Sequence, residues 1–225
     1  MRPLTEKTLA VAARELATRD EMLAGIHAIH GDPPLWRRAT GFTTLVHIIL
    51  EQQVSLQSAK AMLVRLQGII EPFTPERFVE LGYDYLRSLG VTRQKSAYLI
   101  DLSTSIVNGQ LSFTKLARMS DDDARLALTR IKGIGLWSAD VYLLMAMRRA
   151  DIWPAGDLAL AVAMKELKGL PVRPSSLELE QLAEQWRPLR AVAARMLWQY
   201  YLAKRGTQKS TKEQKAQKES SEFKL

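Results

Sequence analysis

Two features near the middle of the chain could do chemistry together: a glycine-rich turn and an acidic side chain that follows it. The turn spans residues 131–135 (Ile-Lys-Gly-Ile-Gly), and Asp157 follows about twenty residues later. Because glycine has no Cβ, the backbone there can turn sharply and approach a ligand closely. A helix that begins at Gly135 would present unpaired N–H groups and a positive dipole end, which suit a phosphate, and Lys132 would add charge.

Asp157 follows a Pro-Ala-Gly loop and precedes an apolar segment, a place where aspartate often caps a helix. The interval between the turn and Asp157 fits one helix and a return loop. A helix from Leu136 to Arg149 would then act as a spacer between a bound phosphate and the carboxylate. Taken alone, the glycine turn is a weak signal, and for Asp157 taken alone a helix cap is the better explanation.

The elements that must position these residues are predicted to be helices throughout. Alternating runs of β-branched residues are missing, and the first segment, from about residue 4 to 18, has one apolar face. Residues suited to cap or start a helix recur along the chain, namely Asp20, Ser55, Thr74-Pro75, Thr92 and Ser120. The sequence therefore predicts an all-α protein.

Composition narrows the kinds of site that the chain can build. The chain has 225 residues, enough for one domain or two small lobes. It has no cysteine, which excludes disulfides, a thiol nucleophile, thiolate zinc sites and cysteine-ligated iron–sulfur clusters, and its three histidines do not favour a zinc site. A net charge of +8 makes nucleic acid the first partner to consider, although a merely solvated basic surface stays open.

The two ends of the chain carry separate expectations. The N-terminal segment contains acidic residues and has no cleavage pattern, so we expect a helix of the mature protein rather than a signal peptide. No apolar run is long enough to span a bilayer. From residue 206 to 225 the chain is polar and lysine-rich, so we expect a disordered tail. That tail either adds non-specific attraction to phosphates or only aids solubility. The absence of cysteine fits the cytoplasm.

The turn, the spacer and Asp157 together resemble the helix-hairpin-helix DNA glycosylase superfamily, whose signature is a Gly-Ile-Gly hairpin followed by a loop with an essential Asp. Three further segments resemble the same superfamily: IILEQQVSLQSAKAM, LGVTRQKSAYLIDLS and WRPLRAVAARMLWQYYLAK. The resemblance implies a two-lobed, all-α domain over residues 1–205 with an active-site cleft between the lobes. Lobe one would cover about 37–148, and lobe two about 1–36 plus 149–205.

One position separates subfamilies of that superfamily. Members that also cut the DNA strand carry a lysine two residues after the second hairpin glycine, where its amine forms a Schiff base with the sugar. This chain has Trp137 there, so the resemblance implies a glycosylase without lyase activity. Trp at this position is similar to the 3-methyladenine DNA glycosylase II family. Larger members of that family begin with an extra β-rich domain, which we do not expect here.

The implied reaction is hydrolysis of the N-glycosidic bond of an alkylated purine, such as 3-methyladenine or 7-methylguanine, after the nucleotide is flipped out of double-stranded DNA. Asp157 would stabilise the positive charge that builds on the sugar, or activate water; the sequence leaves both roles open. No cofactor is required, and the protein is expected to act as a monomer in the bacterial cytoplasm or nucleoid. Two alternatives remain: a glycosylase of the same fold for another lesion (hypoxanthine, ethenoadenine, or an oxidised or mispaired base), and a DNA-binding module without chemistry.

The resemblance also carries over individual positions. Gln53 matches the residue that fills the space left by the flipped nucleotide. The base pocket would be formed by Trp137, Trp198, Val141 and Leu158, although Trp198 also suits core packing. The DNA contacts would come from Lys132, Gly133, Ile134, Gly135 and Ser138, with Arg93 and Lys95 on an earlier turn. A sodium or potassium ion could rest on the main-chain carbonyls of Thr129, Ile131 and Ile134.

Overall fold

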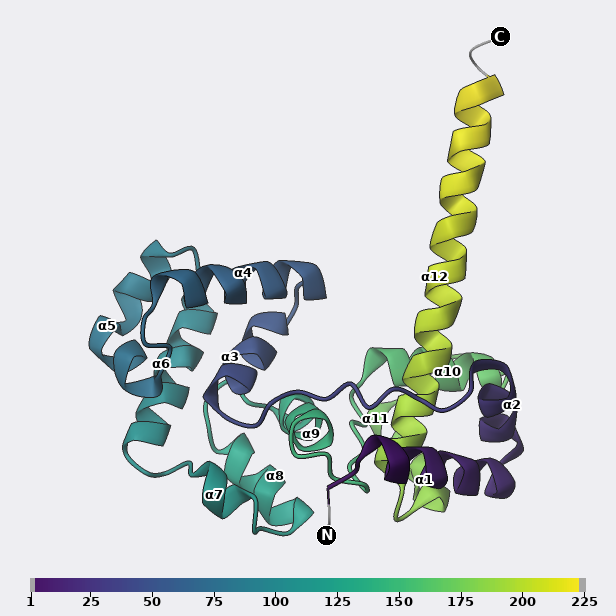
Figure 1. The fold of residues 1–225 in the computed structure, drawn as a ribbon, viewed down its shortest axis with the longest axis horizontal. Helices are drawn as coiled ribbons and strands as arrows, with labels where there is room; N and C mark the ends of the chain where they lie inside the picture. Colours follow the sequence, from purple (N-terminus) through teal and green to yellow (C-terminus); the bar gives the residue numbers. More distant parts are fainter. Residues whose placement is uncertain (1–2, 223–225) are drawn as a thin grey trace. The chain divides into compact units, whose positions relative to one another are not determined.

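Helix is the regular secondary structure throughout the part of the chain that the structure describes, as the sequence predicts (Figure 1). The computed structural model describes residues 3–222, with side chains described as far as Gly206. The chain divides into two compact units, Met1–Pro3 with Trp36–Pro154 and Leu4–Leu35 with Ala155–Leu225. No helix within residues 3–222 has both the length and the apolar character that a membrane crossing needs.

The first unit carries the predicted hairpin. Its helices are α3 (Phe42–Glu51), α4 (Leu56–Ile69), α5 (Pro75–Ser88), α6 (Arg93–Val107), α7 (Phe113–Leu116), α8 (Asp121–Thr129) and α9 (Leu136–Met145). Helix α3 is apolar on nearly every side and is packed against α4, α6 and α9, which makes it the centre of this unit. Burial of its leucine and isoleucine side chains contributes about 1.5–3 kcal/mol each.

The spacer helix is shorter than the sequence predicts. Helix α9 ends at Met145 rather than at Arg149, and Arg148 adopts a left-handed backbone with φ 57°. The Arg149 guanidinium binds Asp121 and main-chain carbonyls before α8, including that of Met119 at 3.0 Å. These contacts bind the segment after α9 to the first unit, which extends to residue 154 rather than to 148.

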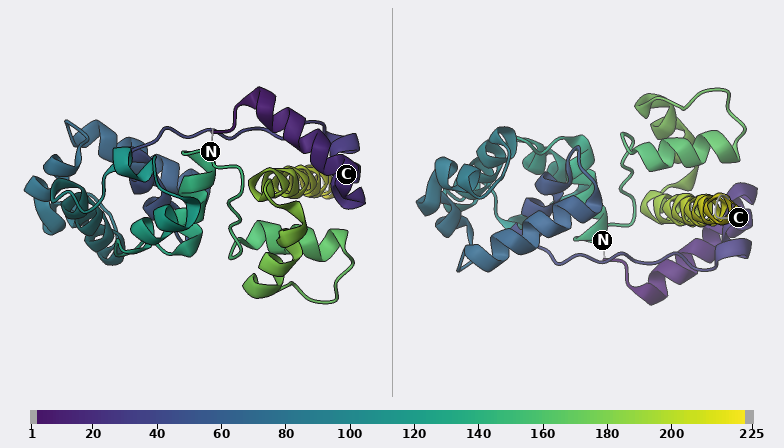
Figure 2. Two further views of the ribbon diagram at one scale, coloured as in Figure 1. Left: turned by 90° about the horizontal axis from the view of Figure 1, so that it is seen from below. Right: turned by 90° about the horizontal axis from the view of Figure 1, so that it is seen from above.

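The second unit is organised around the C-terminal helix. It contains α1 (Glu6–Arg19), α2 (Glu21–His30), α10 (Leu158–Leu167), α11 (Ser176–Ala183), the 3-10 turn Glu184–Trp186 and α12 (Arg190–Glu222). Figure 2 shows α12 end-on, with α1 on one side and α10 on the other. Arg195 lies fully buried in this unit, where burial lowers its pKa to about 10.

The lysine-rich segment differs from the expected disorder. The backbone of α12 continues as a helix through residues 206–222, and residues 223–225 lie outside the described part. The expectation rested on the lack of apolar side chains for packing. The Lys, Gln, Glu and Ala residues that dominate the segment have high helix propensity, which accounts for the helical backbone.

Candidate active site and hairpin

The predicted hairpin joins α8 to α9, and the second of these helices begins where the sequence places it. Gly135 is the N-cap of α9 and provides no side-chain cap, so the first turn of α9 lacks the side-chain acceptor that most helices here possess. The hairpin closes with a bond from the Ile134 N–H to the Ile131 carbonyl at 3.0 Å. An uncapped helix start is suited to an external anion such as a phosphate.

The two hairpin glycines have different roles. Gly133 has a φ of 89°, and a Cβ built on it would lie 2.2 Å from Cγ of Tyr98. Only glycine fits there, because the backbone conformation and the close ring both exclude a side chain. At Gly135 φ is −81°, and an added Cβ would meet no atom within 4 Å. The fold itself therefore does not require glycine at position 135.

Three N–H groups of the hairpin, those of Ile131, Lys132 and Ile134, are already bound within the protein. The Lys132 N–H donates to Oδ2 of Asp101 on α6 at 2.9 Å. These hairpin N–H groups therefore have partners within the protein, and the start of α9, which has no side-chain cap, is the part of the hairpin region that we consider for an anion. The Lys132 side chain is exposed, as the charge argument requires. Asp101 was missed, because no local signal links it to a turn 31 residues away.

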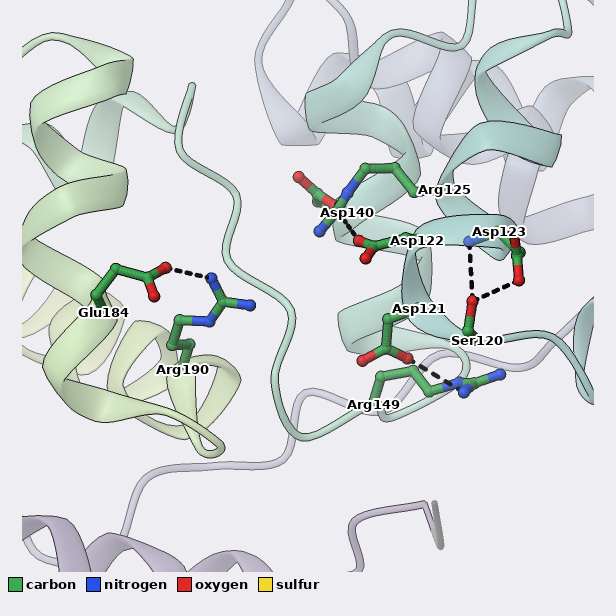
Figure 3. A network of polar contacts seen from close by, with 9 residues as sticks. All are labelled: Ser120, Asp121, Asp122, Asp123, Arg125, Asp140, Arg149, Glu184 and Arg190. Atoms are coloured by element: carbon green, nitrogen blue, oxygen red, sulfur yellow. Dashed lines mark hydrogen bonds and ion pairs between the residues drawn. The ribbon is translucent and has the colours of Figure 1, made fainter.

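Figure 3 shows the ion pairs that fix the helices on both sides of the hairpin. Arg125 of α8 donates from Nε to Oδ1 of the buried Asp140 on α9 at 2.6 Å, and from Nη1 to Asp122 at 2.9 Å. Arg149 pairs with Asp121 at 3.1 Å. Because Asp140 is buried, loss of Arg125 would leave its carboxylate without this compensating charge. The hairpin therefore lies between two helices, α8 and α9, that an ion pair connects directly.

Gln53, which we expect to fill the space left by the flipped nucleotide, lies in the turn after α3. It follows the C-terminus of α3, is exposed, and has a left-handed φ of 58° that non-glycine residues seldom adopt. The preceding Gln52, which the sequence interpretation passed over, donates from Nε2 to the Gly133 carbonyl at 2.8 Å and to Ser138 Oγ at 3.2 Å. Ser138 is only 3% exposed, so its side chain contacts Gln52 rather than solvent.

Arg93 and Lys95, which we expect to contact DNA from an earlier turn, differ in their exposure to solvent. Arg93 is exposed at the start of α6. Lys95 is half-buried, donates from Nζ to the Leu50 carbonyl at the end of α3 at 2.7 Å, and has its pKa lowered by burial. Lys95 therefore supports the turn after α3, whereas Arg93 keeps the exposure that a phosphate contact requires.

Asp157 is the N-cap of α10, as the interpretation of this residue as a helix cap predicts. Its Oδ1 accepts hydrogen bonds from the Ala159 and Leu160 N–H groups at 2.9 and 3.0 Å, and from the Trp198 indole at 3.0 Å. The residue is 8% exposed. It lines an open hollow of about 390 Å³ together with Leu158 and Arg173. The carboxylate is thus fixed in orientation and still opens onto a surface cavity.

The residues expected to form a base pocket have different surroundings. Trp198 on α12 is 7% exposed, and its indole N–H is bound to Asp157, so it orients the carboxylate in addition to packing in the core. Leu158 is 59% exposed beside Asp157. Trp137 is half-exposed on the first turn of α9, whereas Val141, one turn later, is packed in the first unit. Arg173 was not foreseen, since an isolated arginine in a loop gives no sequence signal.

The carbonyls proposed for a cation lie around the end of α8. The Ile131 carbonyl already accepts the Ile134 N–H, but a carbonyl oxygen has a second lone pair. Thr129 is the last residue of α8, where the helix dipole is negative. Within residues 3–206, whose side chains the structure describes, no group of three or more His, Cys, Asp or Glu side chains is placed to hold a metal ion.

Comparison with known proteins yields a consistent set of matches. The family model described as HhH-GPD superfamily base excision DNA repair protein matches residues 46–188. A Bacillus subtilis protein, provisionally named DNA-3-methyladenine glycosylase, is 29% identical over 184 residues, which are 78% of this chain and 64% of the relative. Schizosaccharomyces pombe DNA-3-methyladenine glycosylase 1 is 27% identical over 161 residues, 70% of this chain and 71% of the relative.

A solved structure shares the same architecture. It is a 3-methyladenine DNA glycosylase of Schizosaccharomyces pombe in complex with abasic DNA. The two structures have a TM-score of 0.77 and 25% sequence identity, and the match covers 83% of this chain and 94% of the solved one. The chain spans less than two thirds of the Bacillus subtilis relative, 64% of its length. The matched family region contains the hairpin, the turn after α3 and Asp157, and it ends before Trp198.

Proposed function

Because the chain belongs to the HhH-GPD superfamily of base excision DNA repair proteins, we propose that it is a DNA glycosylase that releases alkylated purines such as 3-methyladenine and 7-methylguanine and leaves an abasic site. The observation that carries this proposal is Asp157, a carboxylate fixed by three N–H donors at a helix start and open to a surface hollow. The names of the relatives support the alkylated substrate.

The proposed chemistry needs little beyond a positioned negative charge. A purine alkylated on a ring nitrogen is cationic, so when the C1′–N bond breaks, its electron pair neutralises the leaving base. Positive charge then builds on the sugar, where the Asp157 carboxylate stabilises it electrostatically. Water adds to C1′ and loses a proton to Asp157 or to solvent. The hydrogen bonds on Oδ1 keep the carboxylate from rotating, which limits its reorganisation during the reaction.

DNA binding is assigned to the first unit. The uncapped start of α9 at Gly135 would hold a backbone phosphate, with Lys132 and Arg93 adding charge, while Gln53 fills the space left by the flipped nucleotide. A sodium or potassium ion on the carbonyls of Thr129, Ile131 and Ile134 would supply a further positive charge near that phosphate. The proposed substrate is double-stranded DNA with a damaged base, bound by a monomer in the bacterial cytoplasm or nucleoid.

The proposal limits the enzyme to hydrolysis. Trp137 stands where lyase members of the superfamily have a lysine, so no amine is available there for a Schiff base. An indole face attracts a cationic base by about 0.5–2 kcal/mol, and Trp137, half-exposed on α9, is the residue we assign to this contact. Trapping of the protein on DNA by borohydride would reveal a Schiff base and would contradict the proposal that the enzyme only hydrolyses.

The test compares two aspartates with the same structural role. Asp157→Asn retains an acceptor for the helix N–H groups, so the fold should persist while the charge is lost. The matched control is Asp20→Asn, because Asp20 also caps a helix (α2) and also accepts an indole N–H, from Trp186 at 2.8 Å. We expect Asp157→Asn to lower single-turnover base release about 100-fold or more while DNA binding remains. Asp20→Asn should release base at the wild-type rate.

A lesion panel decides the substrate. Duplexes with 3-methyladenine, 7-methylguanine, hypoxanthine, ethenoadenine and 8-oxoguanine are incubated with the wild-type protein, and released bases are quantified. Release confined to hypoxanthine, ethenoadenine or 8-oxoguanine would show that the substrate is another lesion and not the proposed alkylated purine. Tight DNA binding with no release from any duplex would favour a binding module, and Asp157→Asn excising at the wild-type rate would remove Asp157 from the mechanism.

A further inference from the structure

One face of α6 contacts both of the segments assigned to DNA. Lys95, Tyr98 and Asp101 are spaced three residues apart and therefore lie along one side of the helix. Lys95 donates from Nζ to the Leu50 carbonyl at 2.7 Å, just before the turn after α3 that carries Gln53 (the Gln53 turn). Tyr98 lies against Gly133, and Asp101 accepts the Lys132 N–H at 2.9 Å. The Gln53 turn and the hairpin thus have a common support.

Gln52 connects these two segments directly. Its Nε2 carries two protons, and both have acceptors in the hairpin region, the Gly133 carbonyl at 2.8 Å and Ser138 Oγ at 3.2 Å. The connection spans 81 residues of sequence. On either side of it lie the exposed Gln53, with its left-handed backbone, and the hairpin that precedes α9. A side chain in this place fixes the separation between the two.

We propose that Gln52 is a positioning residue that fixes the separation between Gln53 and the hairpin, which we call their register. With this separation fixed, both segments meet one DNA duplex without rearrangement; the inference rests on the proposed function. A residue that enters the duplex and a clamp on the backbone must act at a fixed separation. Groups that are fixed before binding avoid the loss of freedom that ordering them would otherwise require. Gln52 contacts only protein and acts through its neighbours.

The register predicts an effect specific to DNA with a missing base. Binding to undamaged DNA depends mainly on charge attraction to phosphates, which does not require Gln53 to be placed accurately. Binding to a duplex with a vacant position requires Gln53 and the hairpin together. The ratio of the affinity for the abasic duplex to the affinity for the undamaged duplex therefore reports the register. If Gln52 had only a structural role, its replacement would change stability, and the folded protein would keep the wild-type ratio of these affinities.

The experiment uses two substitutions at Gln52 and the same two at a control position. Gln52→Met has similar length without donors, and Gln52→Glu has the same shape without donors. The control is Gln57 on the first turn of α4, which is exposed, so Gln57→Met and Gln57→Glu reproduce the changes in polarity and charge nearby. Dissociation constants are measured at one salt concentration for an undamaged duplex and for the same duplex with a tetrahydrofuran abasic analogue. Thermal unfolding is followed in parallel.

We expect both Gln52 variants to reduce the preference for the abasic duplex about tenfold, with undamaged-duplex affinity within about twofold for Gln52→Met, as small misplacements of positioned groups do. Both Gln57 variants should keep the wild-type preference. A folded Gln52→Met or Gln52→Glu protein with the wild-type preference would overturn the proposal. Should neither fold, Gln52→Asn keeps the amide on a side chain that is shorter by one methylene and so draws it away from the Gly133 carbonyl, and an unchanged preference in that variant would overturn the proposal equally.

This measurement separates the register from the proposed reaction. No bond is broken in the binding assay, so a wild-type protein that releases no base from any lesion refutes the proposed chemistry alone. Base release from a 3-methyladenine duplex is then compared under single-turnover conditions. If Gln52→Met lowers both the preference for the abasic duplex and the rate of base release, the result supports the proposed register. If it lowers base release but leaves that preference unchanged, Gln52 has another role.

Discussion

Replacing Gly135 by alanine tests the assignment of the hairpin as a phosphate clamp, because the fold itself does not require glycine there. The backbone has φ −81° and ψ 177°, which any residue adopts, and the added methyl would have no protein atom within 4 Å. Alanine is a poorer N-cap than glycine, but a surface change of this kind alters the free energy of unfolding by about 1 kcal/mol or less. Gly135→Ala should therefore fold normally.

The expected loss in DNA affinity follows from the start of α9. A methyl group at Gly135 keeps a phosphate from reaching the N–H groups of the first turn of α9. Loss of one hydrogen bond to a charged group weakens binding by about 1.5–3 kcal/mol. Since each 1.4 kcal/mol is tenfold, the dissociation constant should rise about 10- to 150-fold.

Gly133→Ala provides the contrasting variant. Its positive φ of 89° adds about 1–2 kcal/mol of backbone strain for alanine, and overlap with Tyr98 adds about 1–3 kcal/mol. The free energy of unfolding should therefore fall by about 2–5 kcal/mol. This is a large part of the stability of a typical domain. Calorimetry should show a clear fall in Tm for Gly133→Ala and almost none for Gly135→Ala.

Fluorescence polarisation with a labelled duplex, carrying the tetrahydrofuran abasic analogue, measures the affinity at one fixed salt concentration. A folded Gly135→Ala protein that binds this duplex like the wild type would refute the clamp, because it would show that no phosphate approaches Gly135. A large fall in its Tm would instead refute the structural description of Gly135 as open.

Three further outcomes are expected. Trp198→Phe keeps an aromatic ring but removes the N–H donor to Asp157; calorimetry should show about 1.5–3 kcal/mol of lost stability, and single-turnover base release should fall about tenfold. Gln53→Ala should keep the wild-type Tm, since the side chain is exposed, but weaken binding to the abasic duplex more than to undamaged DNA in the polarisation assay. Lys132→Ala should weaken binding to every duplex alike and reduce the slope of log affinity against log salt by about 1; an unchanged slope would place Lys132 away from the phosphates.

Local signals in the sequence were sufficient for the helices and for the hairpin. A cap bonds to an N–H two or three residues later, so it can be read from neighbouring residues. The structure confirms each predicted cap, because its side chain accepts a hydrogen bond from a backbone N–H of the following helix. These caps are Asp20, Ser55, Thr74, Thr92 and Ser120. Asp157 shows the limit of such reading. The same local pattern indicates a cap and a catalytic group, and the cap is what orients the carboxylate.

Tertiary structure alone decided which side chains support the site. Trp198 reaches Asp157 across 41 residues, and Gln52 reaches Gly133 across 81. Neither contact has a sequence signal, since an indole suits a core equally well and an amide at a helix end is commonly exposed. Such partners are set by how α12 packs on α10 and how α3 packs on α9. That packing depends on the summed burial of many apolar side chains rather than on the order of a few neighbours.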